Sequence, residues 1–290
     1  MSIQTVTFDT YAQAAATVAG SDRAHLMGGG TLLMRAVNEA DAGIDTLVTV
    51  QQARNAAARV EGDKLVLPAS MTMAGILKSR DCAFLHPVAR LVGGPAIRNM
   101  ASVGGNLFAP SPYGDLATAL LAMEASVLLA SSNQWITLEQ LLRDRTHEYT
   151  AASSNASVTA SLGGSGQVVV EVSCNRPQAP ADFRFHKVSR VQPKGISVMA
   201  LAAHLPGAGG GVMKGVRVAY GAMGPTPQRV PSVERCLEGA VLDETSIAAA
   251  VARAADDVSP PTDAIASSWY RQTVAPVHLG RMLRSTGTGN

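Results

Sequence analysis

Apolar and polar positions form short blocks over the first fifty residues, and their spacing changes from strand-like to helix-like and back. An Ala-rich stretch at 11–19 predicts a helix, while apolar runs at 24–27 and 46–50 predict buried strands. A helix-like run at 32–39 lies between the two strands. Strand, glycine turn, helix and strand in succession predict a compact α/β unit within residues 1–56.

A second unit is predicted over residues 57–175, where strand-like and helix-like runs again alternate. The expected strands are 65–67, 126–130 and 168–172, and the expected helices are 72–78, 84–92 and 116–124. Asp115 directly precedes the last helix and is a candidate N-cap. The Ser-, Thr- and Gly-rich stretch 149–166 lacks the apolar residues of a core element, which favours a surface loop.

The remaining residues, 176–290, follow a Pro-containing linker at 176–180 and have a different pattern. Three strand-like runs come first, and two helix-like runs come after them. The strands are expected at 183–188, 197–203 and 215–219, and the helices at 244–255 and 264–283. Strands followed by helices favour an α+β domain over another βαβ repeat. The sequence therefore predicts an α+β protein, with two N-terminal subdomains followed by a smaller α+β domain.

Composition limits the classes of protein that fit this pattern. Of the 290 residues, 47% are hydrophobic and 16% are charged, which is typical of a globular protein. A net charge of +2 without a Lys/Arg run does not favour nucleic acid as a partner. The sequence has no apolar run of membrane-spanning length and no basic signal-peptide start. We expect a soluble, cytoplasmic chain, with export on a signal-bearing partner left open.

The three cysteines, Cys82, Cys174 and Cys236, lie far apart in the sequence. They form no C-x-x-C pair and have no nearby His at metal-ligand spacing. This pattern favours free thiols in the core over a metal or redox site. His25, three residues before a glycine run, is interpreted as an ordinary strand residue.

Two glycine loops are the candidate binding elements: Gly28-Gly29-Gly30-Thr31 and Ser102-Val103-Gly104-Gly105-Asn106. Glycine allows close approach to a ligand and positive φ angles at little cost, and successive backbone N–H groups form an anion-binding nest. Two such loops indicate one anionic ligand held from both sides. For the first loop alone, a tight turn without a ligand is the alternative.

Two common phosphate-binding motifs do not fit these loops. The G-x-G-x-x-G fingerprint would need glycine where Leu33 stands, and no G-x-x-x-x-G-K-[ST] motif is present. A Rossmann or P-loop arrangement is therefore not expected.

The residues around both loops resemble the flavin-binding medium subunit of molybdenum hydroxylases. That family includes carbon monoxide dehydrogenase, quinoline oxidoreductase, nicotine dehydrogenase and, as a fused domain, xanthine dehydrogenase. Residues 26–33 are similar to its A-G-G-T-x-L loop, and 97–106 to its I-R-N-x-A-[ST]-[IV]-G-G-N motif. Ser111, Pro112 and Asp115 stand where the family has S-P-x-x-D-L.

The C-terminal part carries the same resemblance. Residues 185–190 are similar to the family's F-x-K-x-x-R strand, 221–227 to its G-A-[MV]-x-P-T-P turn, and 267–271 to its S-x-x-Y-R helix. The resemblance thus covers nearly the whole chain in the family's order.

The resemblance implies one extended FAD between two N-terminal subdomains of the PCMH type. Both loops would donate backbone N–H groups to the pyrophosphate. Asp115 would accept hydrogen bonds from flavin-side hydroxyls. Lys187 would lie near the isoalloxazine rim, where a cation raises the flavin potential; a solvated strand-edge lysine is the alternative. The implied FAD-binding residues are Met27, Gly28, Gly29, Gly30, Thr31, Leu32, Leu33, Ser102, Val103, Gly104, Gly105, Asn106, Ser111, Asp115, Val168, Val169 and Lys187.

The sequence departs from the family pattern at Leu32 and in the stretch 149–166. Leu32 replaces a residue that is commonly Asp or Ser, which predicts one side-chain contact fewer to the flavin. Val168 and Val169, which would form a wall near the flavin ring, follow the stretch 149–166, where the family has a more regular segment.

In this family a molybdenum–pterin centre on a large subunit hydroxylates the substrate, and two [2Fe–2S] clusters on a small subunit carry the electrons to FAD. The resemblance therefore implies an electron-transfer subunit without catalytic residues or metal of its own, in a dimer of heterotrimers. Three scattered cysteines cannot hold the clusters, so the partners would be separate polypeptides.

Two alternatives compete with this function. One is a stand-alone flavin oxidase of the PCMH superfamily with its own substrate pocket. Thr31 weakens it, because covalent-flavin relatives often place His at that position of the loop. The other is a non-enzymatic scaffold that has lost its flavin, and two intact loops argue against it.

Overall fold

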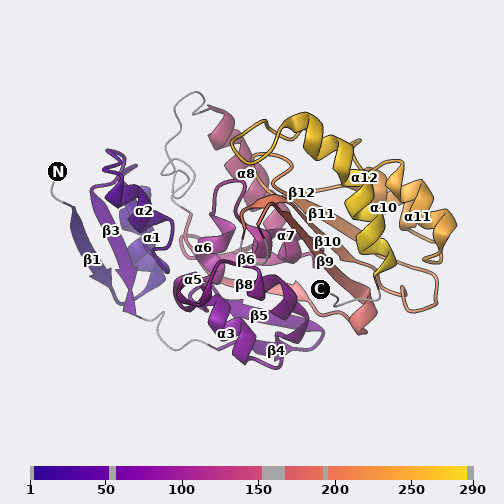
Figure 1. The fold of residues 1–290 in the computed structure, drawn as a ribbon. Helices are drawn as coiled ribbons and strands as arrows, with labels where there is room; N and C mark the ends of the chain where they lie inside the picture. Colours follow the sequence, from indigo (N-terminus) through magenta and orange to yellow (C-terminus); the bar gives the residue numbers. More distant parts are fainter. Residues whose placement is uncertain (1–2, 52–56, 152–166, 192–194, 286–290) are drawn as a thin grey trace.

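The computed structural model describes residues 3–51, 57–151, 167–191 and 195–285, and of residues 146–151 only the backbone. Three sheets follow one another along the chain: one of three strands, one of five and one of four. Figure 1 shows the first sheet at one side of the molecule and the third sheet at the other. The combination of helices and sheets confirms the predicted α+β class.

The first sheet is parallel, with the order β1-β3-β2. Its elements are β1 (Gln4–Phe8), α1 (Tyr11–Ala19), β2 (Ala24–Leu26), α2 (Leu33–Asn38) and β3 (Thr46–Val50). Thr10 caps α1 in a reciprocal bond with Gln13, which explains why the helix begins at Tyr11. The sequence pattern missed β1, because its residues QTVTF are mostly exposed and polar.

The second sheet has the order β4-β5-β8-β6-β7, and all its neighbouring strands are antiparallel. Its strands are β4 (Arg59–Glu61), β5 (Lys64–Pro68), β6 (Ser126–Leu129), β7 (Trp135–Thr137) and β8 (Val169–Asn175). The helices of this region are α3 (Met73–Lys78), α4 (His86–Arg90), α5 (Pro95–Met100), α6 (Val103–Leu107), α7 (Asp115–Ala122) and α8 (Leu138–Ala151).

Two predictions for this region are corrected. The single helix expected at 84–92 is a 3-10 turn at Ala83–Leu85 followed by α4, because Pro87 fits the first turn of a helix but not its interior. The loop expected at 149–166 overlaps the last residues of α8, which ends at Ala151. Residues 152–166 lie outside the described part of the chain.

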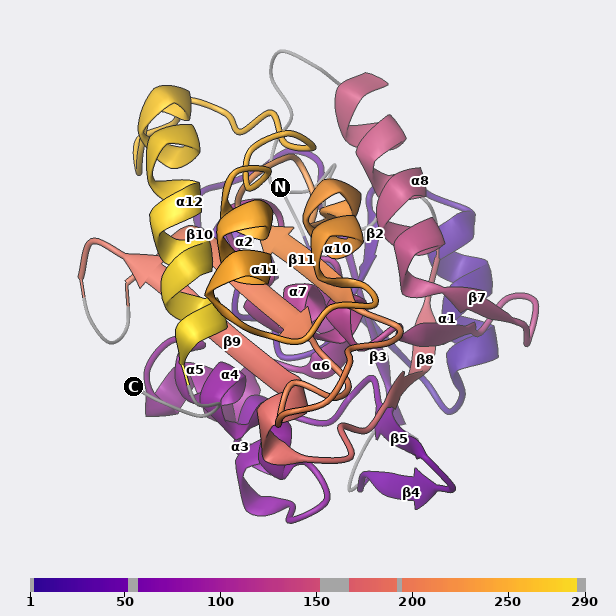
Figure 2. The ribbon, with the colours of Figure 1, turned by 90° about the vertical axis from the view of Figure 1, so that its right-hand side faces the viewer.

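The third sheet is antiparallel, with the order β12-β11-β10-β9. Its strands are β9 (Phe183–Ser189), β10 (Ser197–His204), β11 (Arg217–Gly221) and β12 (Gln228–Arg229), and its helices are α10 (Pro231–Leu237), α11 (Glu244–Val251) and α12 (Ser268–Arg284). Figure 2 shows these three helices over one face of the sheet. The sequence pattern missed α10.

The two faces of β10 carry side chains of different size. Met199 and Leu201 belong to the core under α10–α12, whereas Ala202 packs into the core around α7. On β11, a methyl group added at Gly221 would overlap with Thr118 Oγ1 of α7. Alanine and glycine on one face therefore let α7 lie directly on the sheet.

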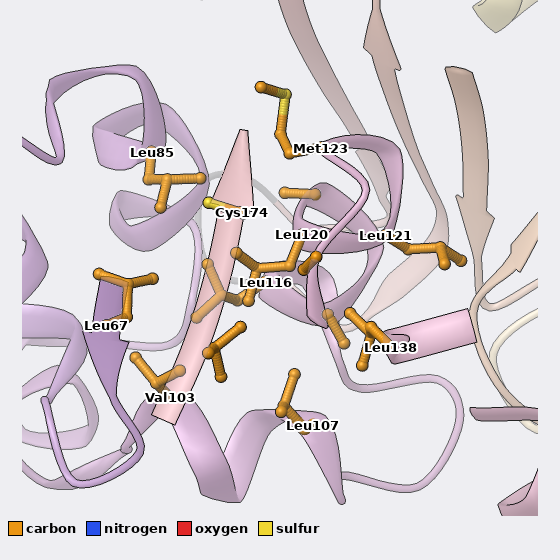
Figure 3. Close-up of a cluster of buried hydrophobic side chains, with 14 of the residues drawn as sticks. Leu67, Leu85, Val103, Leu107, Leu116, Leu120, Leu121, Met123, Leu138 and Cys174 are labelled. Carbon is orange, nitrogen blue, oxygen red and sulfur yellow. The ribbon is translucent and has the colours of Figure 1, made fainter. Parts of the chain in front are cut away.

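Helix α7 is enclosed between the second and third sheets, and all eight of its residues are buried. Figure 3 shows Leu116 and Leu120 of α7 among Val103 and Leu107 of α6, with side chains of β5 and β8 close by. A helix that is apolar all around is stable only when it is surrounded. This helix therefore joins the two sheets through one core.

The remaining sequence-based expectations concern single residues and membrane spans. The three cysteines are free thiols, with Cys82 and Cys174 buried and Cys236 half-buried. His25 lies in β2, and its Nε2 is 3.0 Å from the Gly43 carbonyl oxygen. Within the described ranges, every helix is too short or too polar to cross a bilayer.

We expect Leu120→Ala to lower the free energy of unfolding by about 2–5 kcal/mol, because the fully buried side chain leaves a cavity between two sheets. Chemical denaturation measures this loss. Val191→Ala is the matched control, since that side chain is 66% exposed and its loss should cost less than about 0.5 kcal/mol. Equal losses in the two variants would contradict the placement of α7.

Stability should also depend on His278 of α12. Burial, helped by His186 and Arg281, lowers the pKa of His278 from 6.5 to about 4, and its ring stacks on His186 with centroids 5.2 Å apart. Between these values the unfolded chain binds more protons than the folded one. The free energy of unfolding should therefore fall by about 1–2 kcal/mol as the pH drops from 6.5 to 4, after allowance for partial exposure.

Denaturant titrations across that pH range test the effect. His278→Gln should flatten the profile, since glutamine does not titrate. An unchanged slope in this variant would show that another group causes the pH dependence.

Candidate functional site

The first glycine loop connects β2 to α2 and keeps its backbone donors free. Met27 N donates to Val48 O at 2.7 Å, so the strand pairing continues up to the loop. Gly30 has a φ of +68°, where glycine is favoured, and its carbonyl accepts from Met34 N. Within the described residues, the N–H groups of 28–32 donate to no protein acceptor. Successive free N–H groups of this kind are the donors from which anion-binding nests are built.

The second glycine loop is the beginning of helix α6, and the N–H groups of residues 103–106 are already bonded within the protein. Ser102 is the N-cap, and its Oγ accepts from Gly105 N at 3.1 Å. Val103 N donates to Met71 O at 2.8 Å, and Gly104 N donates to Ala69 O at 2.7 Å. Asn106 N donates to Ser102 O. The sequence-based expectation that both loops present free N–H groups therefore applies to the first loop alone.

Gly28 and Gly29 of the first loop allow its backbone to lie close to Met100 and Ser102. A methyl group added at Gly29 would overlap with Met100 O, and one added at Gly28 would lie 2.6 Å from Ser102 Oγ. At Gly104 an added methyl would meet Ala69, 3.0 Å away, and would thus point into the protein. Gly28 and Gly29 are consequently required for the backbones of two subdomains to approach each other.

Two cavities meet at these loops. One, of about 360 Å³, lies toward α1 and β3, and the other, of about 300 Å³, lies toward β9 and α7. We call them cavity A and cavity B. Leu26, Gly28, Gly29, Leu33, Ser102 and Gly105 line both. The free N–H groups of the first loop therefore stand at the junction of two adjoining spaces, each within the size range of ligand sites.

Cavity A has polar and apolar walls that the sequence analysis did not identify. Tyr11, Gln51, Ser70, Asn99 and Phe108 line it. Burial raises the pKa of Tyr11, while a hydrogen bond with Ser70 acts in the opposite direction. This bond joins α1 of the first subdomain to the second one. Apart from Asn99, which belongs to the 97–106 motif, these residues lie outside the glycine motifs, so only the folded structure reveals them.

Cavity B contains a buried ion pair. Lys187 Nζ of β9 lies 2.7 Å from Asp115 Oδ2, and the two side chains are only 6% and 8% exposed. Lys187 Nζ also donates to Leu91 O at 3.1 Å, and Ser197 Oγ donates to Asp115 Oδ1 at 2.6 Å. A buried ion pair persists only with such additional hydrogen bonds. Lys187 is thus not the solvated strand-edge lysine of the alternative interpretation.

The expectation that Asp115 caps α7 is wrong. Gly114, with a φ of 100°, is the N-cap, and Asp115 is the first residue of the helix. Its carboxylate turns to Lys187 and Ser197 instead. Ser197 was missed by the sequence analysis, although it is the one hydroxyl-bearing residue of the run 197–203.

The predicted site residues fall into four groups: those that line neither cavity, cavity A, cavity B or both. Three of them line neither cavity: Val103, Ser111 and Val168. Val169 lines cavity A, whereas Lys187 lines cavity B, so these two residues do not share one wall. Met27 and Gly104 line cavity A, Gly30, Thr31, Leu32, Asn106 and Asp115 line cavity B, and the others line both.

Val168 and the Ser111 hydroxyl, which line neither cavity, are both buried. Val168 packs against α1 in the small core of the first subdomain. Ser111 Oγ is buried without a hydrogen-bond partner among the described residues.

Comparison with known families decides what kind of site this is. Residues 1–160 match the family model described as the FAD binding domain in molybdopterin dehydrogenase. The chain belongs to this family. Residues 184–286 match the CO dehydrogenase flavoprotein C-terminal domain. The resemblance drawn from the two loops is confirmed, and the chain is an FAD-binding part of an oxidoreductase.

Individual relatives agree with this assignment. The glyceraldehyde dehydrogenase medium chain of Sulfolobus acidocaldarius is 24% identical over 202 residues, which cover 70% of this chain and 66% of the relative. The nicotinate dehydrogenase FAD-subunit of Eubacterium barkeri is 26% identical over 223 residues, covering 75% and 72%.

A solved structure shows that the fold extends over the whole chain. Carbon monoxide dehydrogenase from Hydrogenophaga pseudoflava superposes with a TM-score of 0.83 at 20% identity, covering 99% of this chain and 97% of that chain. The fold is therefore shared from the first sheet to α12.

Gly29→Ala should weaken FAD binding by at least about tenfold, because the methyl group takes the space of Met100 O and separates the two loops. Titration of the apoprotein with FAD, followed by flavin fluorescence, measures the dissociation constant. Gly209→Ala is the matched control, since a methyl group there meets no atom within 4 Å. Unaltered FAD binding by Gly29→Ala would contradict the close approach of the loops.

Proposed function

We propose that this chain holds one FAD across both cavities and acts as the electron-transfer subunit of a molybdenum hydroxylase. The observation that carries the proposal is the position of the first loop. Its free N–H groups lie where cavity A meets cavity B, and a buried Lys187–Asp115 pair lies at the far side of cavity B.

The free donors of the first loop fit the pyrophosphate of FAD. A pyrophosphate carries negative charge at the centre of an extended dinucleotide, with an aromatic group on each side. The N–H groups of 28–32 supply donors without bringing a formal charge. The second loop would contribute its side chains and the shape of the junction between the cavities, because the N–H groups of 103–106 bond within the protein.

The charges at cavity B determine the direction in which FAD is expected to lie. Lys187 Nζ has two protein acceptors, Asp115 Oδ2 and Leu91 O, which leaves one N–H for a ligand. A cation beside a flavin ring stabilises its anionic reduced form. We therefore assign the isoalloxazine to cavity B and the adenosine to cavity A, where Tyr11, Phe108 and Val169 offer apolar surface.

Bound FAD would supply storage for two electrons between a donor and an acceptor. The residues of this chain hold the cofactor, fix its orientation and keep a compensated positive charge at its ring. The N–H groups of the first loop are the positions at which the backbone of this chain would bond to FAD, whereas Ser111 lines neither cavity.

The proposed partners follow from what this chain does not carry. A [2Fe–2S] cluster requires four cysteine or histidine ligands, and the three cysteines of this chain lie far apart in the sequence. The names of the two relatives, a medium chain and an FAD-subunit, refer to proteins made of several chains. We propose a large molybdenum–pterin subunit and a small subunit with two [2Fe–2S] clusters as partners, in a dimer of heterotrimers.

Absorbance of the purified chain tests this function. After incubation with FAD it should show a flavin band that dithionite bleaches. Aldehyde and N-heterocycle substrates should leave the band unchanged in the isolated chain and bleach it in the complex with both partners. Bleaching of the isolated chain by such a substrate would support the stand-alone oxidase instead, and absence of FAD binding would support the flavin-free scaffold.

A further inference from the structure

Beyond the binding of FAD, which this inference presupposes, a chain of contacts connects cavity B to a buried arginine in the C-terminal domain. It begins at Ser197, which is 2% exposed and donates to Asp115 Oδ1 at 2.6 Å. Asp115 Oδ2 accepts from Lys187 at 2.7 Å. Ser197 and Lys187 thus bind opposite oxygens of one carboxylate, which fixes the rotation of the carboxylate.

A β-bulge brings Ser197 to this carboxylate. Ser197 pairs with Ser189 and Met199 pairs with Val188, so Val198 is an extra residue on β10. Met199 faces the core under α10–α12. In a regular strand Ser197 would face the same way, since alternate residues share a face. The bulge reverses its direction, so that Ser197 faces Asp115 on α7.

Arg271 of α12 holds the bulged residue. Its Nε donates to Val198 O at 2.9 Å, and its side chain is fully buried. The other guanidinium nitrogens bind both carboxylate oxygens of Asp263, at 3.0 and 2.9 Å, and the carbonyls of Pro261 and Ala266. All five donors of the guanidinium are thus occupied. Such a fork is rigid, and lysine cannot reproduce it.

We propose that Arg271 and Ser197 are positioning residues for the flavin-facing charge. Arg271 fixes the backbone at Val198, the bulge directs Ser197 to Asp115, and the fixed carboxylate holds the Lys187 ammonium with one N–H facing cavity B. The arginine of the S-x-x-Y-R motif thereby acts on the cofactor from another domain, without touching it.

The test compares variants of the full chain loaded with FAD. Ser197→Ala should weaken FAD binding about tenfold, because a displaced Lys187 ammonium loses its charge-assisted hydrogen bond to the flavin. It should also lower the midpoint potential of the flavin, because Asp115 becomes less neutralised and the ammonium less well held. Ser197→Thr keeps the hydroxyl group and should restore both values.

Arg271→Lys should change the potential in the same direction as Ser197→Ala. The double variant should have the potential of Ser197→Ala alone, because Arg271 acts through Ser197. If Arg271→Lys does not fold, Asp263→Asn takes its place. This change weakens the ion pair of the same guanidinium, and the Asp263 side chain is 30% exposed, so the substitution should be tolerated better.

Glu234→Gln is the matched control for general loosening of the domain. Glu234 is 7% exposed, and its carboxylate bonds to Val218 N of the same sheet and to Arg229, away from the Ser197–Arg271 bonds. The Glu234→Gln variant should have a lower melting temperature than the unaltered chain and the same flavin potential. A flavin potential that is unaffected by Ser197→Ala, or additive shifts in the double variant, would overturn the proposal while the proposed function stands. If the unaltered chain binds no FAD, both fall.

Discussion

Helix α7 is the element on which the rest of the structure depends. Its eight residues are buried between two sheets, in a core that contains side chains of both the second and the third sheet. It can lie so close to the third sheet because Gly221 and Ala202 face it. The packing of the helix therefore fixes the position of its first residue, Asp115, in the wall of cavity B. The position of the charge follows from the packing of the helix.

The first subdomain is attached to the rest in a different way. Its contact with the second runs through bare backbone at Gly28 and Gly29, and through the Tyr11–Ser70 bond across cavity A. Within the described residues, the apolar cluster that the two subdomains share is small and includes Val168. An extended ligand between such units becomes part of what holds them together, because it contacts both.

The sequence predicted the buried strands and the glycine loops well, because their patterns are local. It gave the right place for α1, β3 and the start of the third sheet. It missed β1 and β4, which are short, exposed edge strands without an apolar repeat. The capping role of Asp115 and the free N–H groups of the second loop were predicted wrongly, since an Asp before a helix and a Ser-x-Gly-Gly sequence each have more than one possible set of partners.

The sequence by itself determined which segments bury themselves, where the chain turns on glycine, and which family its motifs belong to. Only the tertiary structure decided which backbone N–H groups remain free, why Gly29 must lack a side chain, and that Lys187 is buried with Asp115. It alone revealed the bulge that links Ser197 to Arg271. The physical reason is that a hydrogen-bond partner or a buried charge depends on what packs against it, and those residues lie far away in the sequence.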